Sequence, residues 1–263
     1  MLSDLLSFQM PRLRYGRLSW LLFLLITGMI LASAVSNKRN SFAESTVIEI
    51  IPLEDGDKML TDKDVRQTLL RAFGNTLEGT EIASLEVERI ERVLEEDPFV
   101  LDAETYVGQN NILHIRIQQR EPILRVLDNN GGNYYLDAAG AKMPTSRNYA
   151  ARVLVATGNL APYSPDFQEK RRNTLKDVFK LTQALMADDT WASFIQQVHV
   201  NNANEIVLVP LIGDQKIMLG SVRNLEEKLN KLKIFYQEAM PYAGWRKYKS
   251  INLKYNGQVV CRR

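Results

Sequence analysis

An uncharged, apolar stretch from Leu18 to Val35 constrains this chain more than any other feature of its sequence. As a helix it would measure about 27 Å at roughly 1.5 Å per residue, close to the ~30 Å hydrocarbon thickness of a bilayer. Arg12, Arg14 and Arg17 precede it, whereas Lys38 and Arg39 follow it. This weak excess of positive charge predicts a cytoplasmic N-terminus and a single transmembrane helix. The side chains predicted to anchor it are Leu18, Trp20, Leu21, Leu22, Phe23, Leu24, Leu25, Ile26, Met29, Ile30, Leu31 and Val35.

A cleaved signal peptide is the alternative interpretation, because Ala32-Ser33-Ala34 has the form of a cleavage site. The long segment before the apolar stretch, with its own Leu5, Leu6 and Phe8, argues against it. Both interpretations export everything after residue 40. Export excludes cytosolic nucleotide chemistry and nucleic-acid binding.

Composition is that of a folded protein, with 45% hydrophobic and 24% charged residues. The net charge of +2 conceals an asymmetry. Residues 44–128 carry 19 acidic and 9 basic side chains, whereas residues 216–263 carry 11 basic and 3 acidic ones. This split predicts different partners for the two parts unless it is a chance fluctuation.

No constellation of catalytic or metal-binding residues stands out in the sequence. Cys261 is the only cysteine, which excludes an intramolecular disulfide, and we expect it to be buried on a strand. His114 and His199 are the only histidines, and both lie on the polar alternation of predicted strands. Gly-rich phosphate loops and nucleophile or zinc motifs are missing. The sequence therefore predicts no enzyme, no cofactor and no metal site.

The first exported segment has the order β-α-α-β-β. Residues 47–51 form a β-branched run, Thr61 precedes an amphipathic helix that stops at Gly74, and a second helix covers residues 86–95. Two strands follow at 100–107 and 112–117, joined by a polar turn. The run from Leu94 to Val100, with Asp97-Pro98, and the run from Leu113 to Ile123 resemble a POTRA domain, and more narrowly that of the FtsQ/DivIB cell-division family.

The resemblance continues through the second exported segment. Tyr134 to Gly140 is similar to a family hairpin, and residues 153–158 to a family strand. A long amphipathic helix is predicted over 167–187, a hairpin over 205–219, and a basic helix over 222–237. Strand segments at 251–255 and 258–261 look like the element that closes the family's β domain.

The resemblance implies an α+β protein of five parts: a cytoplasmic tail (1–17), a transmembrane helix (18–35), a linker (36–45), a POTRA domain (46–121) and a β domain (122–263). It also implies a non-enzymatic inner-membrane scaffold at the division site, with most of the chain in the periplasm. Its expected partners are FtsB- and FtsL-like bitopic proteins and, through the POTRA domain, other divisome components. No small-molecule substrate is expected. An exported POTRA-type adaptor outside cell division is the alternative.

The strand predicted over 258–261 is expected to leave one edge of its sheet with unpaired backbone groups, and a partner strand can add to that edge. The family's last strand pairs with FtsB, so the resemblance implies that the partner-binding residues are Tyr255, Gly257, Gln258, Val259, Val260 and Cys261. Aromatic residues between 236 and 255, interleaved with Arg246, Lys247, Lys249 and Lys254, either extend this interface or cap the core.

Overall fold

The computed structural model describes residues 20, 22–30, 41–146 and 149–263. Trp20 and residues 22–30 are helical, and large apolar side chains on this helix are exposed. Within the described part of the chain, no helix is both long and apolar enough to cross a bilayer. The predicted tail (1–17) and residues 36–40 of the predicted linker (36–45) lie outside the described residues, as do Leu18, Leu21, Leu31 and Val35 of the predicted anchor.

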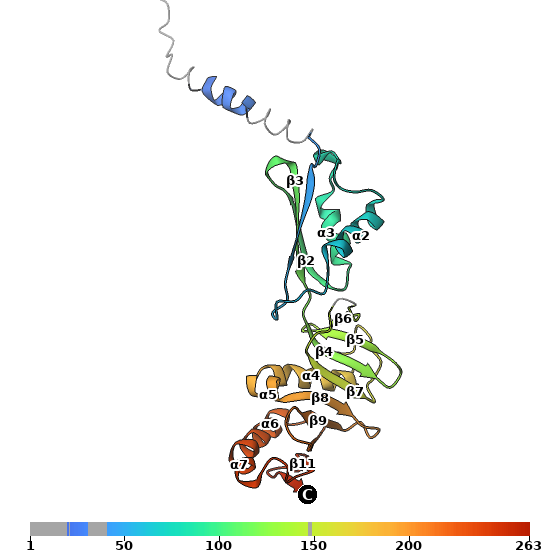
Figure 1. Ribbon diagram of the computed structural model, residues 1–263, viewed down its shortest axis with the longest axis vertical. Coiled ribbons are helices and arrows are strands. Elements are labelled where there is room, and N and C mark those ends of the chain that lie inside the picture. Colours follow the sequence, from blue (N-terminus) through green and yellow to red (C-terminus); the bar gives the residue numbers. More distant parts are fainter. Residues whose placement is uncertain (1–19, 21, 31–40, 147–148) are drawn as a thin grey trace, which may run out of the picture.

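The first sheet is three-stranded, and both of its helices cover one face (Figure 1). Its elements, with the intervening 3₁₀ turns, are β1 (Ser45–Ile51), α2 (Asp62–Phe73), η1 (Ile82–Ser84), α3 (Val87–Glu95), β2 (Val100–Val107), η2 (Gln109–Asn111) and β3 (Ile112–Gln119). The strand order is β1-β3-β2, with β1 parallel and β2 antiparallel to β3. The predicted order β-α-α-β-β is therefore confirmed.

Local sequence signals determine where α2 begins and ends. The Thr61 hydroxyl accepts a hydrogen bond from the Asp64 N–H, and the Asp64 carboxylate accepts one from the Thr61 N–H. This reciprocal cap satisfies N–H groups that have no partner within the helix. Gly74 ends the helix at φ 76°, a left-handed conformation that glycine adopts without strain. The core beneath the helices contains Ile90 of α3 and Leu113 of β3, both fully buried.

The second sheet has nine strands in the order β12-β11-β10-β9-β8-β7-β4-β5-β6. Its strands are β4 (Pro122–Asp128), β5 (Asn133–Asp137), β6 (Lys142–Met143), β7 (Leu154–Gly158), β8 (Ile195–Val200), β9 (Ile206–Pro210), β10 (Lys216–Gly220), β11 (Ser250–Asn252) and β12 (Val260–Arg262). Its helices are α4 (Thr174–Met186), α5 (Asp189–Phe194), α6 (Leu225–Ile234), the π-helical turn η3 (Phe235–Ala239) and α7 (Met240–Ala243). Strands β4, β7 and β8 are mutually parallel, and β10 is parallel to β11.

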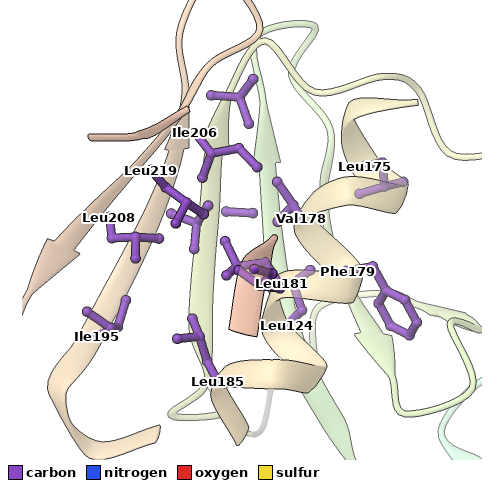
Figure 2. Packing of buried hydrophobic residues seen from close by; sticks show 14 of the residues in the cluster. Leu124, Leu175, Val178, Phe179, Leu181, Leu185, Ile195, Ile206, Leu208 and Leu219 are labelled. Atoms are coloured by element: carbon purple, nitrogen blue, oxygen red, sulfur yellow. The ribbon is translucent and has the colours of Figure 1, made fainter. Parts of the chain in front are cut away.

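Helix α4 lies across the sheet and buries one apolar face against it (Figure 2). Leu175, Val178, Leu181 and Leu185 recur at helical spacing, and each is at most 2% exposed. They meet Leu124, Ile206, Leu208 and Leu219 from the strands. This face belongs to the largest core cluster among the described residues, and it packs against the strands on which the candidate site lies.

Several predicted boundaries are wrong, including that of the strand expected over 258–261, which begins only at Val260. The helix expected over 167–187 begins only at Thr174, because the Asn173 side chain caps it and Phe167 is buried in a preceding turn. The helix expected over 222–237 begins at Leu225, after Asn224 at φ 51°, and becomes π-helical at Phe235. The strand expected over 251–255 ends at Asn252, since the chain turns before Gly257 at φ 70°.

The two sheets are joined by a short segment that carries a buried ion pair. Arg120, between β3 and β4, places Nη1 2.7 Å from Asp137 Oδ2, and Nη2 donates to the Val100 carbonyl at 3.1 Å. The Asp137 side chain is 6% exposed, and its Oδ1 also accepts the Ala139 and Ala141 N–H groups. A small apolar cluster lies beside this pair and draws on both parts of the chain: Leu53, Met59, Tyr135 and Met143.

Candidate partner-binding edge of the second sheet

Strand β12 is the last strand at one end of the nine-stranded order, so it has a neighbour on one side only. It pairs antiparallel with β11, with Ile251 opposite Cys261 and Asn252 opposite Val260. On its other side the strand presents backbone N–H and C=O groups that no described strand pairs.

Backbone alternation identifies which residue points to the open side. The Leu253 N–H donates to the Met218 carbonyl on β10, and successive residues direct their polar groups to opposite sides of a strand. Asn252 therefore faces β12, and its partner Val260 faces β11. The Lys249 N–H donates to the Arg262 carbonyl, which places Arg262 inward as well. The N–H and C=O of Cys261 consequently point away from the sheet.

The side chains of this edge divide between core and solvent. Val259 and Cys261 are half-buried against the main core cluster, and burial raises the pKa of the Cys261 thiol. The cysteine is thus on a strand as expected, although half-buried rather than buried. Val260 is 43% exposed. The edge accordingly combines a packed inner face with an accessible outer one.

Of the six predicted partner-binding residues, only Val260 and Cys261 lie on β12 itself. Tyr255 and Gly257 are in the preceding turn, and Gln258 is exposed just after it. The Tyr255 side chain is 50% exposed, and its carbonyl accepts a hydrogen bond from Lys231 Nζ at 3.0 Å. This contact holds the turn against α6. The six predicted residues lie within one short segment, in the turn before β12 and on β12 itself, at one border of the sheet.

An aromatic cluster packs beneath the π-helical turn. Tyr236 lies 4.8 Å from Phe194 and 5.6 Å from Trp245, measured between ring centroids. Burial raises the pKa of Tyr236, although its hydroxyl accepts a hydrogen bond from Gln215 Nε2 at 3.0 Å. Tyr242, by contrast, is 91% exposed. Some of these aromatic residues therefore cap the core, as Tyr236 does, whereas Tyr242 faces solvent; that such residues extend the interface stays a prediction.

Charges along this border are mostly positive. Lys254 forms an ion pair with Glu205 at 2.8 Å, which raises the pKa of the lysine and lowers that of the glutamate. Arg246, Lys247 and Lys249 are exposed. An acidic partner segment would find complementary charge at this border.

The two histidines lie apart from any such border. His114 stacks on Tyr106 with centroids 5.0 Å apart, and the exposed His199 places Nδ1 2.9 Å from the Thr157 hydroxyl. Over the described residues, no group of three or more His, Cys, Asp or Glu side chains could hold a metal ion.

Helix α5 was missed by sequence reasoning, although it supplies Trp191 and Phe194 to the aromatic cluster. In the sequence, Asp188-Asp189 directly follows the helix predicted over 167–187, and an acidic pair at a helix end is usually solvated. Asp188 instead begins α5, because its side chain accepts a hydrogen bond from the Thr190 N–H. The hydrogen bond from Lys233 lowers the pKa of Asp188.

Comparison with known protein families gives two matches. Residues 121–262, more than half of the chain, match the family described as FtsQ/DivIB, C-terminal related. Residues 47–118 match the POTRA-like domain. A search of curated proteins finds no match to this chain.

Proposed function

Because the chain belongs to the FtsQ/DivIB, C-terminal related family, we propose that it is a non-enzymatic scaffold that supports septum formation during cell division. It combines a POTRA-like domain with a β-rich domain that follows it along the chain. The proposed parts are a cytoplasmic tail (1–17), a transmembrane helix (18–35), a linker (36–45), a POTRA domain (46–121) and a β domain (122–263). The proposal includes no small-molecule substrate and no nucleic acid.

The single inner-membrane span is part of the same proposal, with the N-terminus in the cytoplasm and both domains in the periplasm at the division site. The apolar character of residues 18–35 supports it, as does the helix at Trp20 and residues 22–30 with its exposed apolar side chains. A membrane anchor would raise the effective concentration of other membrane-anchored division proteins near the two domains.

The open edge of β12 is the observation that carries the proposed binding function. An FtsB-like segment, held in a complex with an FtsL-like protein, would add as a further strand beside β12. Backbone hydrogen bonds to Cys261 would supply affinity, and contacts to Val260 and Tyr255 would supply specificity. Positive charge along this border favours an acidic partner segment. Other divisome components would bind the POTRA domain.

A pair of substitutions at Cys261 tests strand addition. Both Cys261→Ala and Cys261→Pro remove the half-buried thiol, but only proline removes the outward N–H. We expect small coiled-coil membrane proteins to co-purify from detergent-solubilised membranes with the wild-type chain and with Cys261→Ala. They should be lost with Cys261→Pro, and a chain ended after Tyr255 should lose them as well.

Folding and localisation provide the controls. The alanine variant matches the packing loss of the proline variant, so the two differ in the outward N–H. Both should retain a cooperative thermal transition, which shows that loss of partners is not loss of the fold. Equal recovery of partners with proline and alanine would refute strand addition at β12. Recovery of partners without enrichment of the chain at midcell would instead favour an exported adaptor that works outside cell division.

A further inference from the structure

A polar cleft of about 760 Å³ opens in the second domain, and none of the six residues assigned to the partner-binding edge lines it. Asn130, Asn159 and Asn204 line it, and each follows the carboxyl end of a strand: β4, β7 and β8, respectively. These three strands are neighbours and run parallel. The carboxyl ends of adjacent parallel strands are where α/β sheets bind ligands, because the connections diverge there and leave a crevice.

Hydrogen bonds between the strand ends make the floor of this cleft rigid. Asn159 Nδ2 donates to Asn204 Oδ1 at 2.9 Å, and the Asn159 N–H donates to the Val200 carbonyl at 2.8 Å. The Thr174 hydroxyl donates to the Asn159 carbonyl at 3.1 Å and accepts the Ala161 N–H at 2.7 Å. The floor is therefore built before any ligand arrives, which lowers the entropic cost of binding.

Three arginines line the same cleft. Arg171 and Arg172 lie just before α4, and Arg223 lies just before α6. All three side chains are exposed, and none has an ion-pair partner among the described residues. Other arginines of the chain do pair, as Arg66 does with Asp62 and Glu78. Three unneutralised guanidinium groups around one cleft attract oxyanions, to which they donate paired hydrogen bonds.

The remaining polar groups favour a ligand that also carries hydroxyls. Asparagine amides and the Ser221 hydroxyl both donate and accept hydrogen bonds. Asp177, half-buried in the first turn of α4, adds one carboxyl group to the wall. A carboxylate among arginines accepts hydrogen bonds from sugar hydroxyls but repels a pure anion.

We propose that this cleft binds an acidic carbohydrate, whose oxyanion is held by Arg171, Arg172 and Arg223 and whose hydroxyls are held by the asparagines and Asp177. The site is independent of strand addition at β12, so either proposal can fail without the other. The oxyanion could be a carboxylate or a phosphate, and the experiment separates these two sources.

Calorimetric titration of the full-length chain in neutral detergent tests the proposal with three probes: trigalacturonate, inorganic phosphate and neutral tri-N-acetylchitotriose. We expect saturable binding of trigalacturonate and weaker binding of the neutral sugar. Arg171→Ala/Arg172→Ala and Arg223→Ala should each weaken binding roughly ten-fold, since each removes charge-assisted hydrogen bonds. Phosphate that competes with trigalacturonate would assign the anion subsite to phosphate chemistry.

Two further variants distinguish a specific site from general basicity. Arg71→Ala removes an arginine on α2 that is also exposed, and it should leave the affinity unchanged. Asp177→Asn should affect the anionic and neutral probes differently, because it removes a negative charge that repels anions. Phosphate should bind a few-fold more tightly, and the preference for trigalacturonate over the neutral sugar should rise. Equal binding of neutral and acidic sugars, no binding of either anion, or an equal effect of Arg71→Ala would each overturn the proposal.

Discussion

The ion pair between Arg120 and Asp137 offers the sharpest test of how the two domains are joined. We consider Arg120→Met, Asp137→Asn and the double variant. Methionine keeps most of the apolar stem of arginine, and asparagine keeps the oxygen that accepts the Ala139 and Ala141 N–H groups. The cycle therefore isolates the interaction between guanidinium and carboxylate across the domain boundary.

The expected loss in free energy of unfolding follows from how deeply the ion pair is buried. Breaking a buried ion pair by removing one partner costs about 3–5 kcal/mol, because the remaining charge is left uncompensated. The Asp137 side chain is 6% exposed, but it keeps two backbone donors, and the Arg120 side chain is 21% exposed. These features reduce the expected cost of Arg120→Met to about 2–3 kcal/mol, with a coupling energy of about 1–2 kcal/mol in the cycle.

Urea unfolding of the full-length chain, followed by tryptophan fluorescence and by circular dichroism, measures these energies. Trp191 and Trp245 lie in the second domain, and the third tryptophan, the exposed Trp20, lies in neither domain. Fluorescence changes on unfolding therefore report on the second domain, whereas circular dichroism reports on both. If the pair couples the domains, the two signals should coincide in the wild-type chain and separate in Arg120→Met.

Arg66→Met is the matched control, because Arg66 also joins a carboxylate and a backbone carbonyl, at Asp62 and Thr46. Its side chain is 44% exposed, so we expect a loss below about 1 kcal/mol. A cost for Arg120→Met no larger than that of Arg66→Met would refute the reasoning from burial. A coupling energy near zero would show that the pair does not join the domains.

Two further changes test buried polar groups. Tyr134→Phe should raise stability by about 1 kcal/mol in thermal unfolding at neutral pH, because the buried Tyr134 hydroxyl has no hydrogen-bond partner among the described residues. Burial raises the pKa of Tyr134 to about 12, so the folded chain retains a proton that the unfolded chain loses above about pH 10. Stability should fall between these pH values, and the phenylalanine variant should lack that part of the fall; a destabilised variant would reveal a partner for the hydroxyl. Lys228→Met should cost about 1–3 kcal/mol in urea unfolding, since Lys228 Nζ donates to the carbonyls of Leu219 and Ser221 and methionine leaves both without that donor. An unchanged midpoint would show that water replaces the lysine there.

The sequence predicts the first domain better than the second, and the reason is the range of the interactions involved. The Thr61 cap, the Gly74 stop and the alternation along β3 are local signals that structure confirms. In the second domain, β4 pairs with β7 across a separate hairpin, and no local pattern predicts that neighbour. Phe167 has helical spacing with Leu175, yet it fills the core from a turn.

The candidate site shows the same limit. The sequence predicts a final strand, but the direction of each N–H on β12 depends on its register with β11, which depends in turn on β10. The cleft with Arg171, Arg172 and Arg223 was not predicted at all. Its residues come from five separate segments, and only the parallel order of β4, β7 and β8 brings them together.

Over the part of the chain that the structure describes, side chains hydrogen-bond to the backbone of both edge strands of the first sheet but not to that of β12 in the second sheet. This difference indicates where a partner strand can add. In the first sheet, Arg66 Nη2 donates to the Thr46 carbonyl on β1 at 2.9 Å. On the opposite edge strand, β2, Glu91 Oε1 accepts the Thr105 N–H at 2.7 Å. Side chains from the two helices thus occupy polar groups on both edges, which is one way that proteins prevent unwanted strand pairing.

Strand β12 has no such protection. Among the described residues, no side chain hydrogen-bonds to the outer backbone of β12, and the nearest contact of that kind is from Lys231 to the Tyr255 carbonyl, outside the strand. Both edges of the first sheet are thus protected, whereas the β12 edge of the second sheet is open to strand addition. If the helices guard the first sheet for this reason, Glu91→Ala should expose β2 and promote self-association of the chain in analytical ultracentrifugation. Cys261→Pro should not reverse that association, because it alters a different edge. Reversal would show that both edges pair with each other, and the distinction between guarded and open edges would then fail.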